Sequence, residues 1–471
     1  MSRRNYGATG GLPFLEPRYS RFAHALVRHL SPIFLKLLEG ISEVSVQGGA
    51  TLIEEYRRFG EGESRLIVAF RHPSASDAPL VGYLFGRRIQ QVAKANGVRL
   101  PRRTLVHFLY GRGVPLWSGP GTGWLLPRIA AIPVYQRRVD SRGMAAVRAA
   151  VVEGRFPIAL APEGQVTYHN KSFGSLEGGT GRIALWAKSD LEKLGISSAV
   201  RILPLSIEYR FGDRAGPTLD RVLQWIEAKT GIPGAVDHRA PGPEIHEALL
   251  SLTEQLVGRL EGMYAPFFKR SATPSELPDR IDRVCNTALR VGERSHGILG
   301  TGTLLDRVFR LRDAGWKRMF RDDIEGLSPV ERGFADAFAE QAKLSARHME
   351  LVDALEYLDP SYISPESDLD RFLEYTLVLQ DVVNRLLGGT IAGRMKVRGR
   401  EAVVKVGTPK SVAELLTAGT GGSAAAGSGL SDGTLDSPES QSPGAEALLL
   451  GRDASRRITE YVAREFARLI E

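Results

Sequence analysis

Cysteine is almost absent from this chain. Cys285 is the single cysteine among 471 residues, so no internal disulfide bond and no zinc site of clustered cysteines can form. Both facts are typical of proteins in a reducing cytosol. The start of the chain also lacks the apolar core of a signal peptide, and the hydrophobic residues 22–41 are interrupted by charges and Pro32. We therefore expect a cytoplasmic protein without a membrane span in this region.

Acidic residues are missing from residues 78–139, although the whole chain contains 54 of them. The same stretch is rich in basic residues, and the formal net charge of the chain is +8. Such a segment creates a positive potential that attracts a phosphate-bearing substrate, an acidic carrier or an anionic bilayer. A solvated basic helix face is the alternative. The basic residues are Arg87, Arg88, Lys94, Arg99, Arg102, Arg103, Arg112, Arg128, Arg137 and Arg138.

The segment near the start of the chain has apolar residues at helical spacing. It predicts an amphipathic pair of short helices, with Arg18, Arg21, Arg28 and Lys36 available to lipid headgroups. Under this interpretation the protein is peripheral on the inner face of a membrane. Packing of the segment on its own domain is the alternative, and the sequence leaves both open. The apolar residues are Phe22, Leu26, Leu30, Phe34, Leu37 and Leu38.

Strand-like and helix-like segments alternate between about residues 44 and 214, which predicts an α/β domain with a mixed or parallel sheet. Functional residues of such folds lie on the loops that leave the strands. The expected strands are residues 66–70, 104–109, 131–135, 157–161 and 201–209. The expected helices include residues 77–95, 141–153 and 180–194.

The remainder of the chain is predicted to be mainly helical. Long helices are expected near residues 328–358 and 368–387, and residues 395–397 and 402–406 resemble a β-hairpin that could return to the sheet edge. A stretch rich in Gly, Ser, Ala and Pro predicts a flexible linker. The predicted organisation is an N-terminal amphipathic segment (1–44), an α/β domain (45–215), a mainly helical extension (216–416), a linker (417–446) and a C-terminal amphipathic helix (447–471).

His72 and Asp77 lie five positions apart, directly after an apolar strand. Pro73 favours an extended conformation at His72, which places the histidine at the strand's end. Ser76 and Asp77 are residue types that begin helices, so the next helix starts with a carboxylate near the imidazole. A histidine titrates at about pH 6.5 when it is unperturbed, and a neighbouring acid can hold it in one tautomer. This is the arrangement that a general base needs. Such a pair also occurs by chance in many chains.

Two further segments carry candidate site residues. Pro162, Glu163 and Gly164 follow an expected strand and predict a tight turn with a carboxylate at its tip. A proline within a later apolar run, Pro204, marks an edge strand, a bulge or the start of a strand. A polar run that contains Lys171 follows the Glu163 turn and could line the same site.

At these positions the sequence resembles the glycerolipid acyltransferases, whose members acylate lysophosphatidic acid or glycerol 3-phosphate. His72 and Asp77 match the family's first block, Asn-His-x4-Asp. Its second block, an apolar strand that ends in a basic residue, is matched by residues 132–137, and its fourth, an apolar block with a proline, by residues 202–205. Only the Pro-Glu-Gly turn matches its third block. The resemblance covers about residues 45–215 and implies an acyltransferase-type mixed sheet flanked by helices.

The resemblance implies an acyltransferase that uses no cofactor and no metal. It would move a fatty acyl group from acyl-CoA or acyl carrier protein to a hydroxyl of a lysophospholipid or glycerol phosphate. His72 would be the general base, oriented by Asp77, and helix-start N–H groups could stabilise the oxyanion. The partners would be these substrates and an anionic membrane surface. The expected substrate-binding residues are Arg137, Arg138, Glu163, Gly164, Lys171 and Pro204.

The sequence departs from the family pattern at two blocks. Arg71 stands where the family has asparagine, and Gln165 and Val166 replace the Thr-Arg pair used around the acceptor phosphate. Another basic residue could supply the phosphate contact, or the acceptor carries a different headgroup. A membrane-associated binding or scaffold protein on a degenerate acyltransferase fold is therefore the alternative. Nucleic-acid binding rests on charge alone, because no P-loop, zinc spacing or RNA-binding signature supports it.

Overall fold

The computed structural model describes residues 7–119, 121–135, 140–234, 242–268, 275–417 and 443–471, with backbone only for residues 443–450. The chain divides into two compact units. Unit 1 comprises Met1–Pro13 and Gly212–Val397, and unit 2 comprises Phe14–Phe211 and Arg398–Glu471. Most of the linker predicted for residues 417–446 lies outside the described residues.

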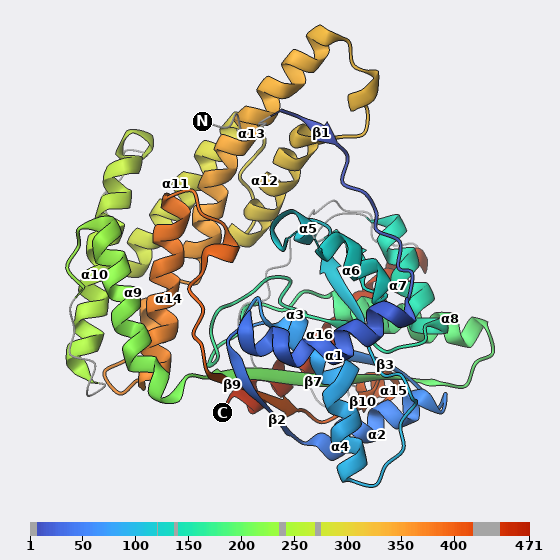
Figure 1. Ribbon diagram of the computed structural model, residues 1–471. Helices are drawn as coiled ribbons and strands as arrows, with labels where there is room; N and C mark the ends of the chain where they lie inside the picture. Colours follow the sequence, from blue (N-terminus) through green and yellow to red (C-terminus); the bar gives the residue numbers. More distant parts are fainter. Residues whose placement is uncertain (1–6, 120, 136–139, 235–241, 269–274, 418–442) are drawn as a thin grey trace. The chain divides into compact units, whose positions relative to one another are not determined.

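Unit 2 is an α/β structure built on a mixed sheet (Figure 1). The strand order is β2-β9-β7-β3-β6-β4-β5, and β10 also pairs with β7. Strands β7, β3, β6, β4 and β5 run parallel, whereas β9 and β10 are antiparallel to β7. The bounds are β2 Ile41–Gln47, β3 Ser64–Phe70, β4 His107–Gly111, β5 Ile132–Val134, β6 Ile158–Leu160, β7 Ala199–Arg210, β9 Arg400–Val406 and β10 Lys410–Ser411.

The strands expected in the α/β part are present as β3 to β7, with ends that differ by a few residues. The prediction of a β-hairpin from residues 395–397 and 402–406 is wrong. Residues 395–397 form no strand, and β9 lies between β2 and β7 rather than at the sheet edge. Val403 and Val404 of this strand are fully buried, and both backbone edges of β9 are paired, with β2 and with β7. Its partner β2 was not expected, since this edge strand is partly exposed and has no continuous apolar run.

Pro204 lies inside a central strand, so the expected edge, bulge or strand start is wrong. On one side, β7 pairs with β3, where Pro204 is opposite Ala69. On the other side, the partner changes next to the proline, because β10 pairs at Ile202 and β9 from Leu205 onward. A proline has no N–H to donate, and this change of partner accommodates it. Its carbonyl accepts a hydrogen bond from the amide of Gly407, between β9 and β10 (2.8 Å).

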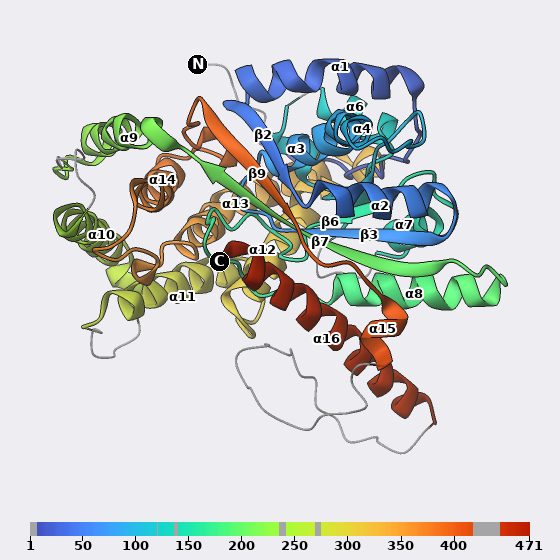
Figure 2. The ribbon, with the colours of Figure 1, turned by 90° about the horizontal axis from the view of Figure 1, so that it is seen from below.

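Helices cover both faces of the sheet of unit 2 (Figure 2). α8 and α16 lie on one face, and α1, α2 and α4 lie on the other. The helices expected from the sequence at residues 77–95, 141–153 and 180–194 are confirmed, the first as α3, a π-helical turn and α4. The bounds are α1 Arg21–Leu37, α2 Gly49–Gly60, α3 Asp77–Tyr83, the π-helical turn Leu84–Arg88, α4 Ile89–Ala95, α5 Val114–Trp117, α6 Thr122–Arg128, α7 Ser141–Glu153, α8 Gly179–Lys193, α15 Val412–Thr417 and α16 Pro443–Ile470.

α1 is one helix and not the expected pair of short helices. Ser20 caps its amino end by accepting a hydrogen bond from the amide three residues further on. Pro32 cannot donate to the carbonyl of Arg28, and the guanidinium of Arg87 donates to this carbonyl instead (3.3 Å). The π-helical turn that follows α3 carries Arg87. The helix therefore continues through its proline with the carbonyl satisfied.

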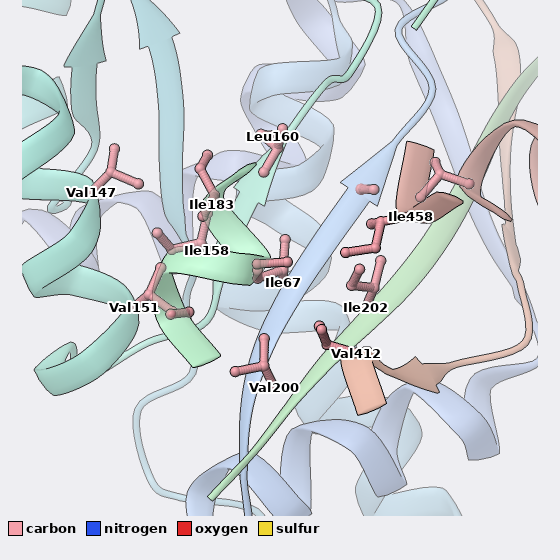
Figure 3. Close-up of a cluster of buried hydrophobic side chains, with 14 of the residues drawn as sticks. Ile67, Val147, Val151, Ile158, Leu160, Ile183, Val200, Ile202, Val412 and Ile458 are labelled. Atoms are coloured by element: carbon pink, nitrogen blue, oxygen red, sulfur yellow. The ribbon is translucent and has the colours of Figure 1, made fainter. Parts of the chain in front are cut away.

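One buried apolar cluster of unit 2 lies between the sheet and helices α7, α8, α15 and α16 (Figure 3). Ile67 of β3 and Ile202 of β7 belong to the same buried cluster as Val147 of α7, Ile183 of α8 and Ile458 of α16. The sequence left the role of the C-terminal helix open. The structure makes α16 a part of the core that supports the central strands.

Unit 1 is mainly helical, and its α13 and α14 confirm the long helices expected near residues 328–358 and 368–387. Strand β1 pairs in parallel with β8. The bounds are β1 Thr9–Gly10, α9 Ala215–Thr230, α10 Pro243–Tyr264, α11 Leu277–His296, α12 Leu304–Met319, β8 Phe320–Arg321, α13 Pro329–Leu355 and α14 Leu369–Leu386. Short 3₁₀ turns are Gly212–Arg214, Ala265–Phe267, Ile324–Gly326, Pro360–Tyr362 and Ile391–Gly393. Within the described ranges, every helix falls short of the length or apolarity that a bilayer span requires.

The contribution of α16 to the stability of unit 2 can be tested by removing the aromatic ring of Phe466. Phe466 of α16 is fully buried in the cluster, so we expect F466A to lower the free energy of unfolding by about 3–5 kcal/mol. Phe22 of α1 is 69 % exposed, and F22A should change this free energy by less than about 0.5 kcal/mol. Chemical denaturation of both variants measures the difference. Equal effects of the two substitutions would show that α16 is not part of the core.

Candidate functional site

The candidate site lies where parallel strands end. β3 ends at Phe70, and the chain continues through Arg71 and His72 before α3 begins at Asp77. β6 runs parallel to β3 and is followed by the turn that carries Glu163. Because parallel strands end at one edge of a sheet, the two loops meet there. The topology therefore brings together two of the sequence motifs.

His72 and Asp77 are in direct contact, as the sequence predicts. Nδ1 of His72 lies 2.8 Å from Oδ2 of Asp77. The Asp77 side chain is fully buried, whereas 18 % of the His72 side chain is exposed. Oδ2 also accepts a hydrogen bond from the amide of Ser74 (2.9 Å). A carboxylate at Nδ1 selects the tautomer that carries its proton there, which leaves Nε2 as the ring nitrogen that accepts a proton.

Glu163 holds the backbone of the histidine. Its Oε1 accepts a hydrogen bond from the amide of His72 (2.7 Å). The carbonyl of His72 accepts a hydrogen bond from the amide of Thr167 (2.9 Å). Both backbone groups of His72 are thus tied to the segment that follows β6. Gly164, next to Glu163, has a φ of +73°, a conformation that glycine adopts readily and that the tight turn requires.

Burial dominates the protonation of Glu163. The side chain is almost entirely buried, and this burial raises the pKa of its carboxyl above the ordinary 4.5. The positive charge of Arg71 and the hydrogen bond from the amide of His72 act in the opposite direction. The net shift is upward, so that folding favours the protonated carboxyl.

Arg71 connects the end of β3 to the loop that contains residues 169–172 through side-chain hydrogen bonds. Its side chain is fully buried. One Nη donates to the carbonyl of Asn170 (2.7 Å), and the other donates to the carbonyls of His169 (2.8 Å) and Ser172 (2.5 Å). An asparagine, which the resembled family has at this position, is too short to span three carbonyls. The departure noted in the sequence therefore has a structural role here.

Tyr209 is a member of the site that sequence reasoning missed. Its hydroxyl donates to Oδ1 of Asp77 from near the end of β7. Arg400 of β9 lies over its ring, with Cζ 4.2 Å from the ring centroid. No local sequence pattern predicts that Tyr209 and Arg400 contact one another and Asp77, because both are more than a hundred positions from Asp77 in the sequence. The apolar run of β7 locates the strand in the sequence but not this contact.

The start of α3 was expected to offer N–H groups to an oxyanion. The amide of Ser74 donates to Asp77, that of Ser76 to Oγ of Ser74, and that of Asp77 to the carbonyl of Ser74. These three donors are therefore engaged within the turn. An oxyanion at this site would need other donors.

The structure does not bring all of the other residues predicted to bind substrate together with the His72–Asp77 pair. Nζ of Lys171 lies 3.8 Å from Oε1 of Glu208 and donates to the carbonyl of Ile470 (3.3 Å), which directs it toward the end of α16. Pro204 lies within β7 and contributes to the sheet. Arg137 and Arg138 lie outside the described residues.

No family model matches this chain, and no curated protein matches it at a significant level. In the part of the chain that the structure describes, no group of three or more His, Cys, Asp or Glu residues is arranged to hold a metal ion.

The buried carboxyl of Glu163 predicts a pH-dependent stability. A carboxyl with a raised pKa binds its proton more tightly in the folded state, so wild-type stability should fall as pH rises from 4.5 through the raised pKa. E163Q keeps the size and the acceptor for the amide of His72 but does not titrate. Its free energy of unfolding should therefore increase relative to wild type over this range. Denaturation at several pH values measures the difference.

E340Q is the matched control, because Glu340 is an exposed glutamate. The difference between E340Q and wild type should be independent of pH. A difference between E163Q and wild type that is equally flat from pH 4.5 to about 8 would contradict the burial argument.

Proposed function

We propose that the protein is an O-acyltransferase on an acyltransferase-type fold. It transfers a fatty acyl group from acyl-CoA or acyl carrier protein to a hydroxyl of a lysophospholipid or glycerol phosphate. The observation that carries this proposal is the contact between His72 and the buried Asp77, with the ring partly exposed at the end of β3. The resemblance to the glycerolipid acyltransferases supports it, since that family has a histidine and an aspartate at this spacing.

The proposed reaction uses the two ring nitrogens in different roles. A lipid alcohol is a weak nucleophile at neutral pH. Nε2 of His72 takes the hydroxyl proton while the oxygen forms a bond to the thioester carbonyl carbon. The tetrahedral intermediate then breaks its C–S bond, and the proton passes from Nε2 to the departing thiolate. Asp77 accepts from Nδ1–H throughout, which orients the ring and stabilises the imidazolium.

The groups around the pair support this chemistry by fixing its geometry. Glu163 and Thr167 hold the backbone of His72 on both sides. A base that is held in place needs little reorganisation when the proton moves. We assign the acceptor phosphate to Arg137 or Arg138, since Lys171 already contacts Glu208. Gly164 is the proposed contact for the acceptor backbone.

We also propose that the enzyme meets its acceptor at an anionic membrane surface. α1 packs one face against the rest of unit 2 and exposes large apolar side chains on the other. Arg21, Arg28 and Lys36 lie on the same helix. An amphipathic helix of this composition binds in the interface between lipid headgroups and acyl chains. The exposed apolar residues are Phe22, Leu30, Ile33, Phe34, Leu37 and the adjoining Leu38.

Removal of the proposed base tests the catalytic assignment. We expect H72A to lower the turnover number by at least about 100-fold, because a positioned general base contributes at least this factor. Thiol release from acyl-CoA, measured with purified protein and lysophosphatidic acid, reports the rate. H246A, in unit 1, is the control and should keep wild-type turnover.

Two results would count against the assignment. Near-wild-type turnover of H72A would remove His72 as the base. Lipid-dependent binding by a wild-type protein that releases no thiol with any lysophospholipid or glycerol phosphate would favour the binding or scaffold protein.

The membrane contact can be tested independently of activity. We expect L37D to weaken co-sedimentation with vesicles that contain anionic lipid, because it places a charge on the exposed apolar face of α1. Leu194 is similarly exposed in the same unit (58 % against 64 %), so L194D is the matched control and should bind normally. Wild-type binding should also weaken as salt rises, because the screening length falls from about 10 Å at 0.1 M to about 3 Å at 1 M. Equal binding of both variants would exclude α1 as the contact.

A further inference from the structure

The carboxylate of Asp77 has a third hydrogen-bond donor in addition to His72 and Ser74. The hydroxyl of Tyr209 lies 2.5 Å from Oδ1, whereas His72 and Ser74 both contact Oδ2. The donors thus divide between the two oxygens. Tyr209 is 3 % exposed and Asp77 is fully buried, so water does not compete for this contact. The contact with the phenol therefore fixes the second oxygen of the carboxylate.

Tyr209 is itself held from its backbone. The side-chain amide of Asn170 donates to the carbonyl of Tyr209 (2.7 Å), and its oxygen accepts from the amide of Tyr209 (2.9 Å). Asn170 belongs to the loop whose carbonyls bind Arg71. The position of the phenol is thus linked to the loop that follows the Glu163 turn.

The ring of Tyr209 also contacts Arg400 of β9. Its guanidinium lies over the ring, and its Nη2 donates to Oγ of Ser76 (2.6 Å) and to the carbonyl of Glu39 (3.2 Å). Oγ of Ser76 in turn donates to Oε2 of Glu39 (2.7 Å). Ser76 immediately precedes Asp77. Arg400 therefore connects the ring of Tyr209 to the residue next to the aspartate.

We propose that Tyr209 is a positioning residue that orients Asp77 and shares its negative charge, so that Asp77 holds the His72 ring without binding its imidazolium too tightly. This role rests on the proposed function, because it concerns the same proton transfer. Loss of the phenol hydroxyl would leave more of the carboxylate's charge for the ring. The imidazolium would then be stabilised relative to the neutral ring.

Charged and titratable groups near this pair come from several elements. Arg71 follows β3, Glu163 follows β6, Arg400 lies on β9, and Glu39 follows α1. Y209F and a ring-fluorinated tyrosine at this position leave each of these charged groups in place. A change in the titration of the histidine is therefore assigned to the phenol.

The first test needs no activity. Nuclear magnetic resonance of protein labelled at histidine follows the ring signal of His72, which is identified by its loss in H72A. We expect Y209F to move the midpoint of this titration to higher pH by about 0.5–1 pH unit. Y56F is the matched control: Tyr56 is fully buried in the same unit, and its hydroxyl donates to the carbonyl of Leu105 (2.9 Å). Y56F should leave the midpoint unchanged.

A ring-fluorinated tyrosine at position 209 gives the opposite expectation. Its more acidic hydroxyl is a stronger donor, so the midpoint should move to lower pH. The ring keeps nearly its native size, so this replacement decides the question even if Y209F does not fold. A midpoint that neither replacement moves beyond the effect of Y56F would overturn the proposal.

The second test separates positioning from general destabilisation. We expect Y209F to lower kcat by about tenfold near pH 7 with KM within about twofold, and the acid limb of its pH profile should move to higher pH. Y56F should change neither the limb nor kcat. A wild-type protein without transferase activity would refute the proposed function, while the resonance experiment would still decide whether Tyr209 acts on the histidine. An unshifted limb in Y209F would overturn the role in catalysis.

Discussion

The buried carboxylate of Asp77 is the constraint on which the candidate site depends. A carboxylate in the interior is tolerated only where hydrogen-bond donors surround it. Here the donors come from the end of β3, from the turn before α3 and from β7. They meet only because β3 and β7 pair with Phe70 opposite Leu205. A shift of this pairing by one residue would turn Tyr209 to the other face of the sheet and leave the carboxylate short of a donor.

Two further buried side chains, Arg71 and Glu163, hold the backbone around the histidine. Arg71 binds the carbonyls of the loop after β6, while Glu163 binds the amide of His72. The two strands β3 and β6 are thus joined beyond their ends as well as along their lengths. Catalytic side chains need such support, because a base displaced by a small distance loses most of its effect. The same contacts explain why a buried arginine stands beside the histidine.

The sequence is most informative where the contact is local. His72 and Asp77 are five positions apart, and a strand, a proline and a helix start between them determine how they meet. The apolar runs of β3, β6 and β7 are visible for the same reason. Tyr209 and Arg400 are different, because only the order of the strands brings them to Asp77. The position of β9 was predicted wrongly, since a strand with two distant partners looks like one arm of a hairpin.

The insertion of unit 1 between β7 and β9 affects how the protein is made. Residues Gly212–Val397 are synthesised after β7 and before β9. During their synthesis, the edge of β7 that later pairs with β9 has no partner strand from this chain. Uncovered strands pair with other chains, and nascent proteins at this stage are targets for chaperones. Arg400 of β9 follows residues Gly212–Val397 in the chain. The contacts that β9 makes around Asp77 and Tyr209 can therefore form only after the residues of unit 1 have been synthesised.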